Sequence, residues 1–349
     1  MLDKREEYVK AVIAETELRK DYLDSAEVNT IYFGGGTPTL LCIDNIRQIL
    51  DKIRDLFKVK DEAEITIECN PGDLNEEYLN DIRRIGINRL SIGIQSFDDK
   101  CLQLLGRRHS AEDAREAVKI AQEAGFDNIS IDLIYGIPEQ SLKQWRNEIS
   151  QALQLKVQHI SSYCLTYEEG TTMSKMLEKG EIKAVDDETE NEMYDLMVKM
   201  LTNSGYERYE VSNFALQGYR SKHNSAYWDR TTYLGLGAAA HSFDGGSRQW
   251  NKGDLNEYIK ETKARNLQPE IEILTAKDVY NEIVMLSLRT AEGLRLDQLS
   301  EADRIYCREK AEEYICSGRL ELTTDNHLTA TTEGINILNL ITEDRKSVV

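Results

Sequence analysis

The first half of the chain alternates short runs of apolar, β-branched residues with longer stretches in which apolar residues recur three and four positions apart. The short runs are typical of buried strands, and the longer spacing is typical of amphipathic helices. Strands that are almost continuously apolar are buried on both faces, so the pattern predicts a parallel sheet covered by helices. The expected strands lie in residues 30–34, 64–69, 89–97, 128–138 and 159–167, and the expected helices in residues 43–57, 75–85, 98–105, 111–124 and 141–155.

Two α/β architectures fit repeated strand–helix units of this kind, a doubly wound sheet and a barrel. Polar and unusual residues gather where several of the expected strands end. Barrel enzymes draw their sites from the ends of many strands, whereas a doubly wound sheet concentrates its site at one switch point. The sequence therefore favours a barrel. The residues at these strand ends are Gly34 to Thr37, Glu68 to Gly72, Gln95, Asp132 and Tyr163 to Tyr167.

The flanking parts of the chain follow other patterns. Residues 1–23 predict an amphipathic helix with no strand before it, so the first strand of a barrel is missing from the pattern. Beyond about residue 172 come a charged helical pair, a strand with a polar end, an aromatic loop, more helix and a hairpin around Asp325 and Asn326. We expect three regions: a partial barrel in residues 1–170, a rim extension in residues 171–268, and a helical, winged-helix-like domain in residues 269–349.

Composition narrows the function classes. Apolar residues make up 40% of the 349 positions, which is enough for a sizeable core and argues against disorder. The 43 basic and 62 acidic residues give a net charge of −19, which argues against nucleic-acid partners but leaves a peripheral membrane contact open. No signal peptide or membrane-spanning apolar run is present, so the expected location is the cytoplasm. The oligomeric state is not predicted.

The cysteine pattern predicts neither disulfides nor a local metal clip. No two cysteines have the C-x-x-C spacing, and a chain of this length without a secretion signal does not need a disulfide framework. Most of the cysteines are expected to be small buried hydrophobic residues. The six are Cys42, Cys69, Cys101, Cys164, Cys307 and Cys316.

Three successive glycines, Gly34 to Gly36, follow the first expected strand. They are not a phosphate loop, because no Gly-Lys-Ser/Thr follows them, and Thr39 stands where a dinucleotide fingerprint needs its last glycine. Pro38 restricts Thr37 to an extended conformation. The stretch therefore predicts a rim of bare backbone amides and carbonyls that suits a small zwitterion, with a plain tight turn as the alternative.

Four charged or polar side chains at or near the strand ends extend this prediction. The guanidinium of Arg107 suits a carboxylate in forked geometry. Asp132 and Gln95 suit the hydroxyls of a sugar, and Glu68 suits an ammonium group. A carboxylate in a barrel strand is costly unless it is paired or bound to a ligand. Together the four predict a site for an amino-acid nucleoside, with structural ion pairs, such as Glu68 with Arg107, as the alternative.

Six separated segments resemble, in the same order, the HemW family of radical S-adenosylmethionine proteins, which are similar to the oxygen-independent coproporphyrinogen III oxidase. The resemblance extends from about residue 5 to the C-terminal hairpin. It implies a partial (β/α)6 barrel of the TIM-like radical SAM type, with its first strand missing and a C-terminal α+β extension. The segments are "YFGGGTPTLL", "IECNPGDL", "GINRLSIGIQSFDDKCLQLLGRRH", "IDLIYGIPEQ", "SYCLTYEEGT" and "RYEVSNFA…HNSAYW…YLGLGAAAHSFDG".

The resemblance also implies cofactors and a function. The family consists of heme chaperones, which bind heme and pass it to hemoproteins; the recipient here is not identified. One alternative is the oxygen-independent coproporphyrinogen III oxidase, a radical SAM enzyme, and another is a heme-binding module without a cluster or catalysis. By motif match, S-adenosylmethionine is expected to contact Gly35, Gly36 and Thr37 with its methionine part and Glu68, Gln95, Arg107 and Asp132 with its other polar groups.

The heme contacts expected from the resemblance lie in the segment "HNSAYW". His223 offers an imidazole, the usual axial iron ligand, and Tyr227 and Trp228 offer flat apolar faces. A separation of four residues places His223 and Tyr227 on one helical turn. His241, whose small neighbours would let a flat ligand approach, is a second candidate ligand. The alternative is a set of structural histidines packed among core aromatic residues.

The sequence lacks the cysteine motif with which the family binds its iron–sulfur cluster. The family holds its [4Fe–4S] cluster with a C-x-x-x-C-x-x-C loop after the first barrel strand, and none of the six cysteines has that spacing. A cluster of this kind needs cysteine thiolates. We expect a truncated gene model or a fragment, with the loop upstream of residue 1, and a real loss of the segment is the alternative. The strand that carries Ile31 and Phe33 would then be an exposed edge, so the chain should be less soluble than one with that segment restored.

Overall fold

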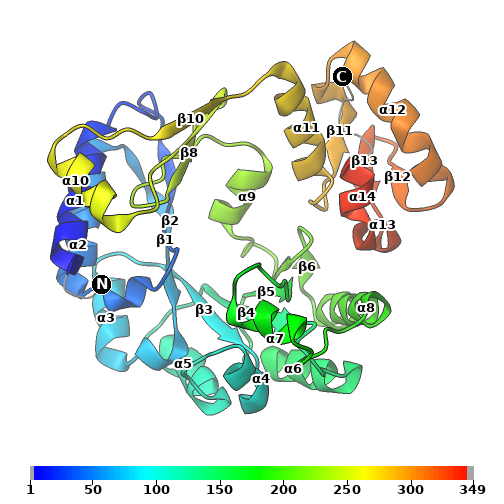
Figure 1. Cartoon of the computed structure of the whole chain (residues 1–349), viewed down its shortest axis with the longest axis horizontal. Coiled ribbons are helices and arrows are strands. Elements are labelled where there is room, and N and C mark those ends of the chain that lie inside the picture. The colour runs from blue at the N-terminus through cyan, green and yellow to red at the C-terminus, as the bar shows by residue number, and fades with distance from the viewer. Residues whose placement is uncertain (1–3, 344–349) are drawn as a thin grey trace.

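A seven-stranded, mostly parallel sheet forms the centre of the protein (Figure 1). The structure is a computed structural model and describes residues 4–343. The strand order is β1-β2-β3-β4-β5-β7-β6; the first five strands are parallel, and β7 pairs antiparallel with both of its neighbours. The expected parallel sheet is therefore confirmed. Its strands are β1 (Val28–Phe33), β2 (Val59–Cys69), β3 (Arg89–Gln95), β4 (Ile129–Tyr135), β5 (His159–Cys164), β6 (Glu207–Arg208) and β7 (Asn213–Ala215).

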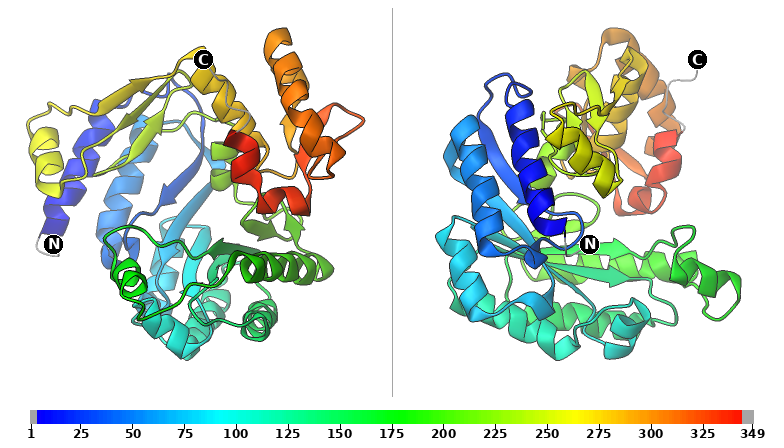
Figure 2. Two further views of the ribbon diagram at one scale, coloured as in Figure 1. Left: turned by 45° about the vertical axis from the view of Figure 1, so that its right-hand side comes forward. Right: turned by 60° about the vertical axis from the view of Figure 1, so that its left-hand side comes forward.

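Helices cover the outer, apolar face of this sheet, and Figure 2 shows them as an arc around the strands. Side-chain caps start several of them: Ser110 and Ser141 form complete capping boxes, and each satisfies amide groups that a helix leaves unpaired. The last of these helices, α8, packs against α6, and α1 packs against α2. The helices are α1 (Arg5–Leu18), α2 (Ile43–Leu56), α3 (Glu76–Arg84), α4 (Asp99–Leu104), α5 (Ala111–Glu123), α6 (Leu142–Gln154), α7 (Thr172–Glu178) and α8 (Asp187–Asn203).

The inner face of the sheet differs from the expectation. Both faces are buried, as the sequence predicted, but only the outer face is apolar. Along β3, the buried Leu90 and Ile92 alternate with the buried polar residues Arg89 and Ser91. Successive side chains of a strand point to opposite faces, so the polar residues of neighbouring strands line one common surface. The almost continuously apolar pattern expected of these strands does not hold on the inner face, where some of the polar groups are hydrogen-bonded, as Ser91 is to Asp132 and Ser130 to His159.

Residues 222–273, from here on called the rim extension, form two helices and a second, three-stranded sheet that lie across the inner face. Of the residues expected in the extension, those of β6 and β7 instead belong to the seven-stranded sheet. The segment "HNSAYW", which the sequence analysis placed in an aromatic loop, is a helix, α9. Its Ser221 N-cap accepts a hydrogen bond from the amide of Asn224. The strand order of the small sheet is β10-β9-β8. The elements are α9 (Lys222–Trp228), β8 (His241–Phe243), β9 (Ser247–Trp250), α10 (Leu255–Lys263) and β10 (Glu270–Ile273).

The C-terminal part has a hydrophobic core of its own, built from residues between Tyr280 and Ile341. The expected hairpin is confirmed: β12 and β13 are antiparallel, and Asn326 in their turn has a φ of +67°. With β11 they form a three-stranded sheet beside the helices. The elements are α11 (Ala276–Ser287), β11 (Leu294–Arg295), α12 (Glu301–Cys316), β12 (Leu320–Leu322), β13 (His327–Ala330), α13 (Thr332–Asn336) and α14 (Leu338–Glu343), with short 3₁₀ turns at Pro38–Leu40, Pro71–Asp73 and Leu296–Gln298. Within residues 4–343, no helix is both long and apolar enough to cross a membrane.

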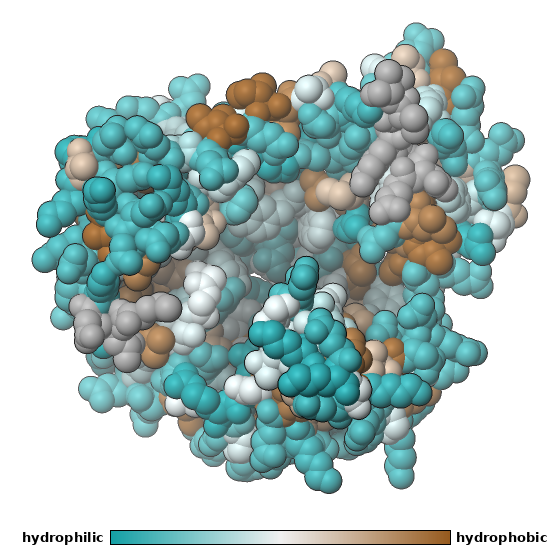
Figure 3. All heavy atoms as spheres, in the orientation of Figure 1, coloured by the Kyte–Doolittle hydropathy of each residue, from teal (hydrophilic) through white to brown (hydrophobic). Residues whose placement is uncertain are grey.

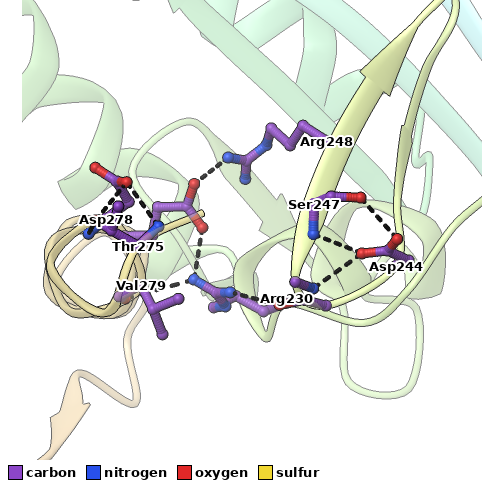
Figure 4. A network of polar contacts seen from close by, with 10 residues as sticks. Arg230, Asp244, Ser247, Arg248, Thr275, Asp278 and Val279 are labelled. Atoms are coloured by element: carbon purple, nitrogen blue, oxygen red, sulfur yellow. Dashed lines mark hydrogen bonds and ion pairs between the residues drawn. The ribbon is translucent and has the colours of Figure 1, made fainter. Parts of the chain in front are cut away.

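A largely buried ion triad joins α11 to the rim extension (Figure 4). The carboxylate of Glu282 accepts a hydrogen bond from Arg230 at 2.5 Å and another from Arg248. The side chains of Glu282 and Arg230 are only 12% and 14% exposed. Removing one member of such a network leaves buried charges without a partner.

We therefore expect Glu282→Gln to lower the free energy of unfolding by about 1 to 3 kcal/mol, because both guanidinium groups lose their anion. Denaturant unfolding followed by far-UV circular dichroism measures this change. The exposed Glu309 on α12 is the matched control, and its change to Gln should cost less than about 0.5 kcal/mol. Equal losses in the two variants would show that the triad does not hold this junction together.

Candidate functional site

The backbone of the glycine stretch after β1 allows neighbouring groups to approach it closely. Gly35 and Gly36 have φ values of +74° and +100°, which favour glycine. A Cβ atom on Gly34 would lie 2.4 Å from the Tyr32 ring and 2.7 Å from Oε1 of Glu68, so any other residue would displace these two side chains. The amide of Gly35 donates to Oε2 of Glu68 at 3.1 Å.

Glu68 is held by the chain next to it rather than by a basic residue. Besides the Gly35 amide, the hydroxyl of Tyr32 donates to its Oε1 at 2.8 Å. No ion pair joins Glu68 to Arg107 within the described part of the chain, so the structural alternative of the sequence analysis is not formed. The Glu68 carboxylate therefore lies against the bare backbone with its negative charge uncompensated by a direct cation.

Asp132 lies near Glu68 on the same face of the sheet. Glu68 pairs in register with Ser91 of β3, whose hydroxyl donates to Oδ2 of Asp132 at 3.3 Å. Burial raises the pKa of Asp132 to about 6, and the charge of Glu68 adds to this shift, whereas Arg89 opposes it. Burial lowers the pKa of Arg107, and the nearby charge of Asp132 partly opposes this shift. Glu68, Asp132 and Arg107 thus share one electrostatic environment.

Gln95 ends β3 with an unusual backbone. Its φ is +70°, a left-handed conformation that costs energy for any residue with a Cβ, and such residues cluster at functional sites. The side chain is 8% exposed and packs over Gly93, where an added Cβ would lie 2.9 Å from Nε2 of Gln95. The amide is thereby directed to the inner face, at the end of β3 beyond Ser91.

A cavity of about 1400 Å³ opens between β1 and the rim extension, and Figure 3 shows a hollow in this region of the surface. It exceeds the roughly 300 to 1,000 Å³ typical of small-molecule pockets. Gly35 and Thr37 lie at its wall, and so do His223, Tyr227 and His241 from the extension. The glycine stretch and three of the four candidate heme residues therefore face one continuous space. Other aromatic residues of the wall are Tyr8, Tyr32, Phe33, Phe57 and Tyr233.

The imidazole of His223 is engaged on every side. Its Nδ1 lies 2.8 Å from the Thr30 hydroxyl and its Nε2 lies 3.0 Å from the Tyr227 hydroxyl. One face stacks on the Tyr32 ring at a centroid distance of 4.7 Å. Burial lowers the pKa of His223 to about 4, and the nearby positive charge of Arg89 adds to this, so the ring is neutral at physiological pH.

Helix α9 is fixed to the sheet by a buried carboxylate. Glu64 of β2, which is 5% exposed, accepts hydrogen bonds from the amides of Lys222 and His223 at 3.1 and 3.0 Å. These amides begin the helix and have no partner within it. Glu64 therefore sets the position of His223 above the sheet.

His241 and Trp228 have different surroundings. His241 begins β8, is exposed, and stacks on Trp250 at a centroid distance of 5.7 Å. Trp228 ends α9 but is not among the residues that line the cavity, and its buried Nε1 has no hydrogen-bond partner among the described residues. The structure brings His223, Tyr227 and His241 to one space and leaves Trp228 outside it.

Sequence reasoning missed several inner-face residues. Tyr32 holds Glu68, Glu64 holds α9, and Arg89 is 2% exposed with no ion pair among the described residues. The sequence did contain a signal for a polar sheet face: in "RLSIGIQ" apolar residues alternate with residues that are polar or glycine. That period identifies a sheet face with functional groups rather than a face packed against helices.

The cysteines do not form a cluster site within residues 4–343. They are dispersed over the fold, and no three metal-ligating side chains come together in this part of the chain. Burial raises the pKa of the Cys69 and Cys164 thiols, which opposes the thiolate form that iron needs. The described residues therefore do not fit a [4Fe–4S] cluster.

Comparison with known proteins identifies the family. Residues 4–152 match the model of the radical SAM superfamily. A protein of Bacillus subtilis (strain 168) called heme chaperone HemW is 35% identical over 298 residues, which cover 85% of this chain and 79% of that protein. A heme chaperone HemW of Mycobacterium tuberculosis (strain H37Rv) is 35% identical over 319 residues, covering 91% of this chain and 81% of that protein.

The fold is also that of a solved structure. Coproporphyrinogen III oxidase (HemN) from Escherichia coli, a radical SAM enzyme, matches all of this chain and 85% of its own with a TM-score of 0.85. At 23% sequence identity this likeness shows the fold alone. The partial radical SAM barrel with its C-terminal extension, expected from the sequence, is confirmed. Because the HemW proteins are 35% identical over most of their length, the chain belongs to the HemW family of radical SAM proteins.

Proposed function

We propose that this protein is a heme chaperone that binds heme in the cavity between β1 and the rim extension, and passes it to hemoproteins. The single observation that carries the proposal is the shared cavity. It is wide enough for a macrocycle, and its aromatic wall offers flat apolar faces. His223 and His241 lie on that wall, and imidazole is the usual axial ligand of heme iron.

A second set of groups lies at the strand ends beside the glycine stretch and suits S-adenosylmethionine; Gly35 and Thr37 line the cavity, whereas Glu68, Gln95, Arg107 and Asp132 are not among its lining residues. Amides of the glycine stretch and the carboxylate of Glu68 suit the amino-acid part, since one supplies donors and the other an acceptor for the ammonium. Asp132 and Gln95 suit the ribose hydroxyls, and Arg107, which has no ion pair among the described residues, suits the carboxylate. When bound beside a cluster, S-adenosylmethionine supplies radical chemistry.

The oxidase alternative has weaker support. The likeness to coproporphyrinogen III oxidase supports the fold and not the activity, because the identity is 23%. The HemW relatives are more similar in sequence and carry the name of a chaperone. Accumulation of a decarboxylated porphyrinogen in an anaerobic assay would favour the oxidase over the chaperone.

Filling the cavity tests the proposed function. Ala226 of α9 lies at the wall, so Ala226→Trp should place an indole where the macrocycle binds and raise the dissociation constant for hemin at least about ten-fold. Hemin titration followed in the Soret region measures this. Ala302, an exposed alanine in α12, is the matched helical control, and Ala302→Trp should leave the constant unchanged.

Transfer is measured in a second arm of the same experiment. Heme-loaded wild type is mixed with apomyoglobin, and the growth of the holomyoglobin Soret band measures the rate of heme transfer. The heme-loaded Ala302→Trp control should transfer heme at the same rate as wild type. Wild-type binding that survives Ala226→Trp would show that heme does not occupy this cavity. Binding without any transfer would favour a heme-binding module over a chaperone.

A further inference from the structure

The chain contains five histidines, and all five lie within the described residues. Three of them do not line the cavity. Nε2 of His109 lies 3.0 Å from the Ile94 carbonyl oxygen, and His159 is fully buried with both ring nitrogens at 2.7 Å from hydroxyl groups. Nδ1 of His327 lies 2.9 Å from the carbonyl oxygen of Glu292, in the C-terminal unit. Only His223 and His241 remain near a ligand in the cavity.

The two remaining imidazoles differ in whether their ring nitrogens already have hydrogen-bond partners. Both nitrogens of His223 lie within hydrogen-bond distance of a hydroxyl, and Tyr32 covers one face of the ring. An iron atom can bind Nε2 of His223 only after the Tyr227 hydroxyl has left. His241 is exposed, and neither of its ring nitrogens has a hydrogen bond or an ion pair within residues 4–343. Its nitrogens are available for an iron atom without any rearrangement.

The backbone of His241 is held in place by its neighbours. An added Cβ on Gly235 would lie 2.0 Å from the His241 carbonyl oxygen, so the chain passes His241 at a distance that only glycine allows. His241 also pairs in register with Trp250 of β9, and the two rings stack at an interplanar angle of 24°. The imidazole is thereby presented on a rigid strand, with one face supported by an indole.

The loop before His241 is anchored to α1. The Gly237 amide donates to Oε2 of Glu15 at 2.8 Å, and Asn251 donates to both the Gly237 carbonyl oxygen and the Glu15 carboxylate. These contacts are buried. They fix Gly237, within the turn from Gly235 to His241, against the helix that forms another part of the cavity wall.

No better iron ligand lies on the cavity wall. Cysteine and methionine side chains are absent from the described residues that line it, which leaves tyrosine as the remaining kind of protein ligand to heme. Burial raises the pKa of the phenols of Tyr8, Tyr32, Tyr227 and Tyr233, so these stay protonated at neutral pH and are poor ligands.

We infer that His241, and not His223, is the axial ligand of the heme iron, while His223 forms part of the wall through its bonds to Thr30 and Tyr227. This inference rests on the proposed function, because it names the ligand in the same cavity. The coordinate bond forms between a lone pair on a ring nitrogen of His241 and ferric or ferrous iron, and it involves no change of oxidation state.

The test is a hemin titration of four proteins: wild type, His241→Ala, His223→Ala and His327→Ala. We expect His241→Ala to bind hemin at least about ten-fold more weakly, with a displaced Soret maximum, because the iron loses its imidazole. Added free imidazole should restore the wild-type maximum in His241→Ala. His223→Ala should keep the wild-type maximum even if its affinity falls, and His327→Ala, which changes a histidine outside the cavity, should match wild type in both.

Each other outcome has a defined meaning, provided that circular dichroism shows all four proteins folded. A maximum that shifts in His223→Ala and not in His241→Ala would overturn the inference in favour of His223. A shift in both variants would indicate two histidine ligands, and a shift in neither would indicate a ligand other than histidine; both results contradict the inference. If wild type itself shows no saturable hemin binding, the proposed function fails and the inference fails with it.

Discussion

Glu15→Gln should lower the free energy of unfolding by about 3 kcal/mol, because it leaves several buried donors without a charged acceptor. The Glu15 side chain is fully buried. Its carboxylate accepts hydrogen bonds from the Tyr258 hydroxyl at 2.6 Å, from Nδ2 of Asn251 at 2.7 Å and from the Gly237 amide at 2.8 Å, and Arg19 lies 3.5 Å away. Glutamine has the same shape but half the acceptor capacity, and it adds donors that face other donors.

Denaturant unfolding of the Glu15→Gln variant measures this loss, and Glu17→Gln is its control on the same helix. Glu17 is 38% exposed and pairs with Lys52 and Arg265 at the surface, so its loss should cost less than about 0.5 kcal/mol. If the two variants unfold at the same denaturant concentration, Glu15 is not the group that holds α1 to the rim extension. A selective loss of hemin affinity in Glu15→Gln would further link this contact to the turn before His241.

Asp132→Asn should have opposite effects on stability and on binding. The folded-state pKa of Asp132 is about 6, above the ordinary 3.8, because burial opposes the ionised form. The folded protein therefore binds this proton more tightly than the unfolded chain does. The wild type should lose stability as the pH rises from about 4 to about 6, and the loss should persist above that range. One pKa unit corresponds to about 1.4 kcal/mol, so Asp132→Asn should be more stable than wild type by up to about 2 to 3 kcal/mol at pH 7.5.

The binding arm of this prediction concerns the proposed S-adenosylmethionine site. Asn at position 132 removes the anion that would accept from the ribose hydroxyls, so the dissociation constant for S-adenosylmethionine should rise about ten-fold in titration calorimetry. Asp127→Asn, at an exposed position, should change neither quantity. A stability difference that does not vary with pH would contradict the raised pKa of Asp132. Unchanged affinity in Asp132→Asn would remove this residue from the proposed site.

The two predictions concern the buried carboxylate of Glu15 and the half-buried carboxylate of Asp132, and only Asp132 was identified from the sequence. Asp132 was identified because a charged residue inside an apolar run is conspicuous, and its neighbour Glu68 ends the strand that pairs with β3. Glu15 was not identified, because a glutamate in a charged helix is usually a solvated residue. Its burial comes from α10 and the turn at Gly237, which lies 222 residues away in the chain.

The candidate heme residues, too, could be identified from the sequence, whereas their contacts could not. Sequence motifs identified His223 and His241 as candidates, but the residues that contact them come from distant segments of the chain. Thr30 bonds His223 across 193 residues, and Gly235 and Trp250 hold His241 by backbone approach and strand register. Residue identity indicates which side chains can ligate iron. Whether a ring nitrogen is already occupied depends on partners that no local pattern reveals.

By itself, the sequence determined the secondary structure of the barrel half, its parallel sheet, the C-terminal hairpin and the family, because helix and strand periods are local and motif residues are read directly. The tertiary structure decided which face of each strand is polar, where "HNSAYW" becomes a helix, and which polar groups meet around the cavity. These features depend on contacts between segments far apart in the chain, and the energy of a buried polar group is set by the partners it meets after folding.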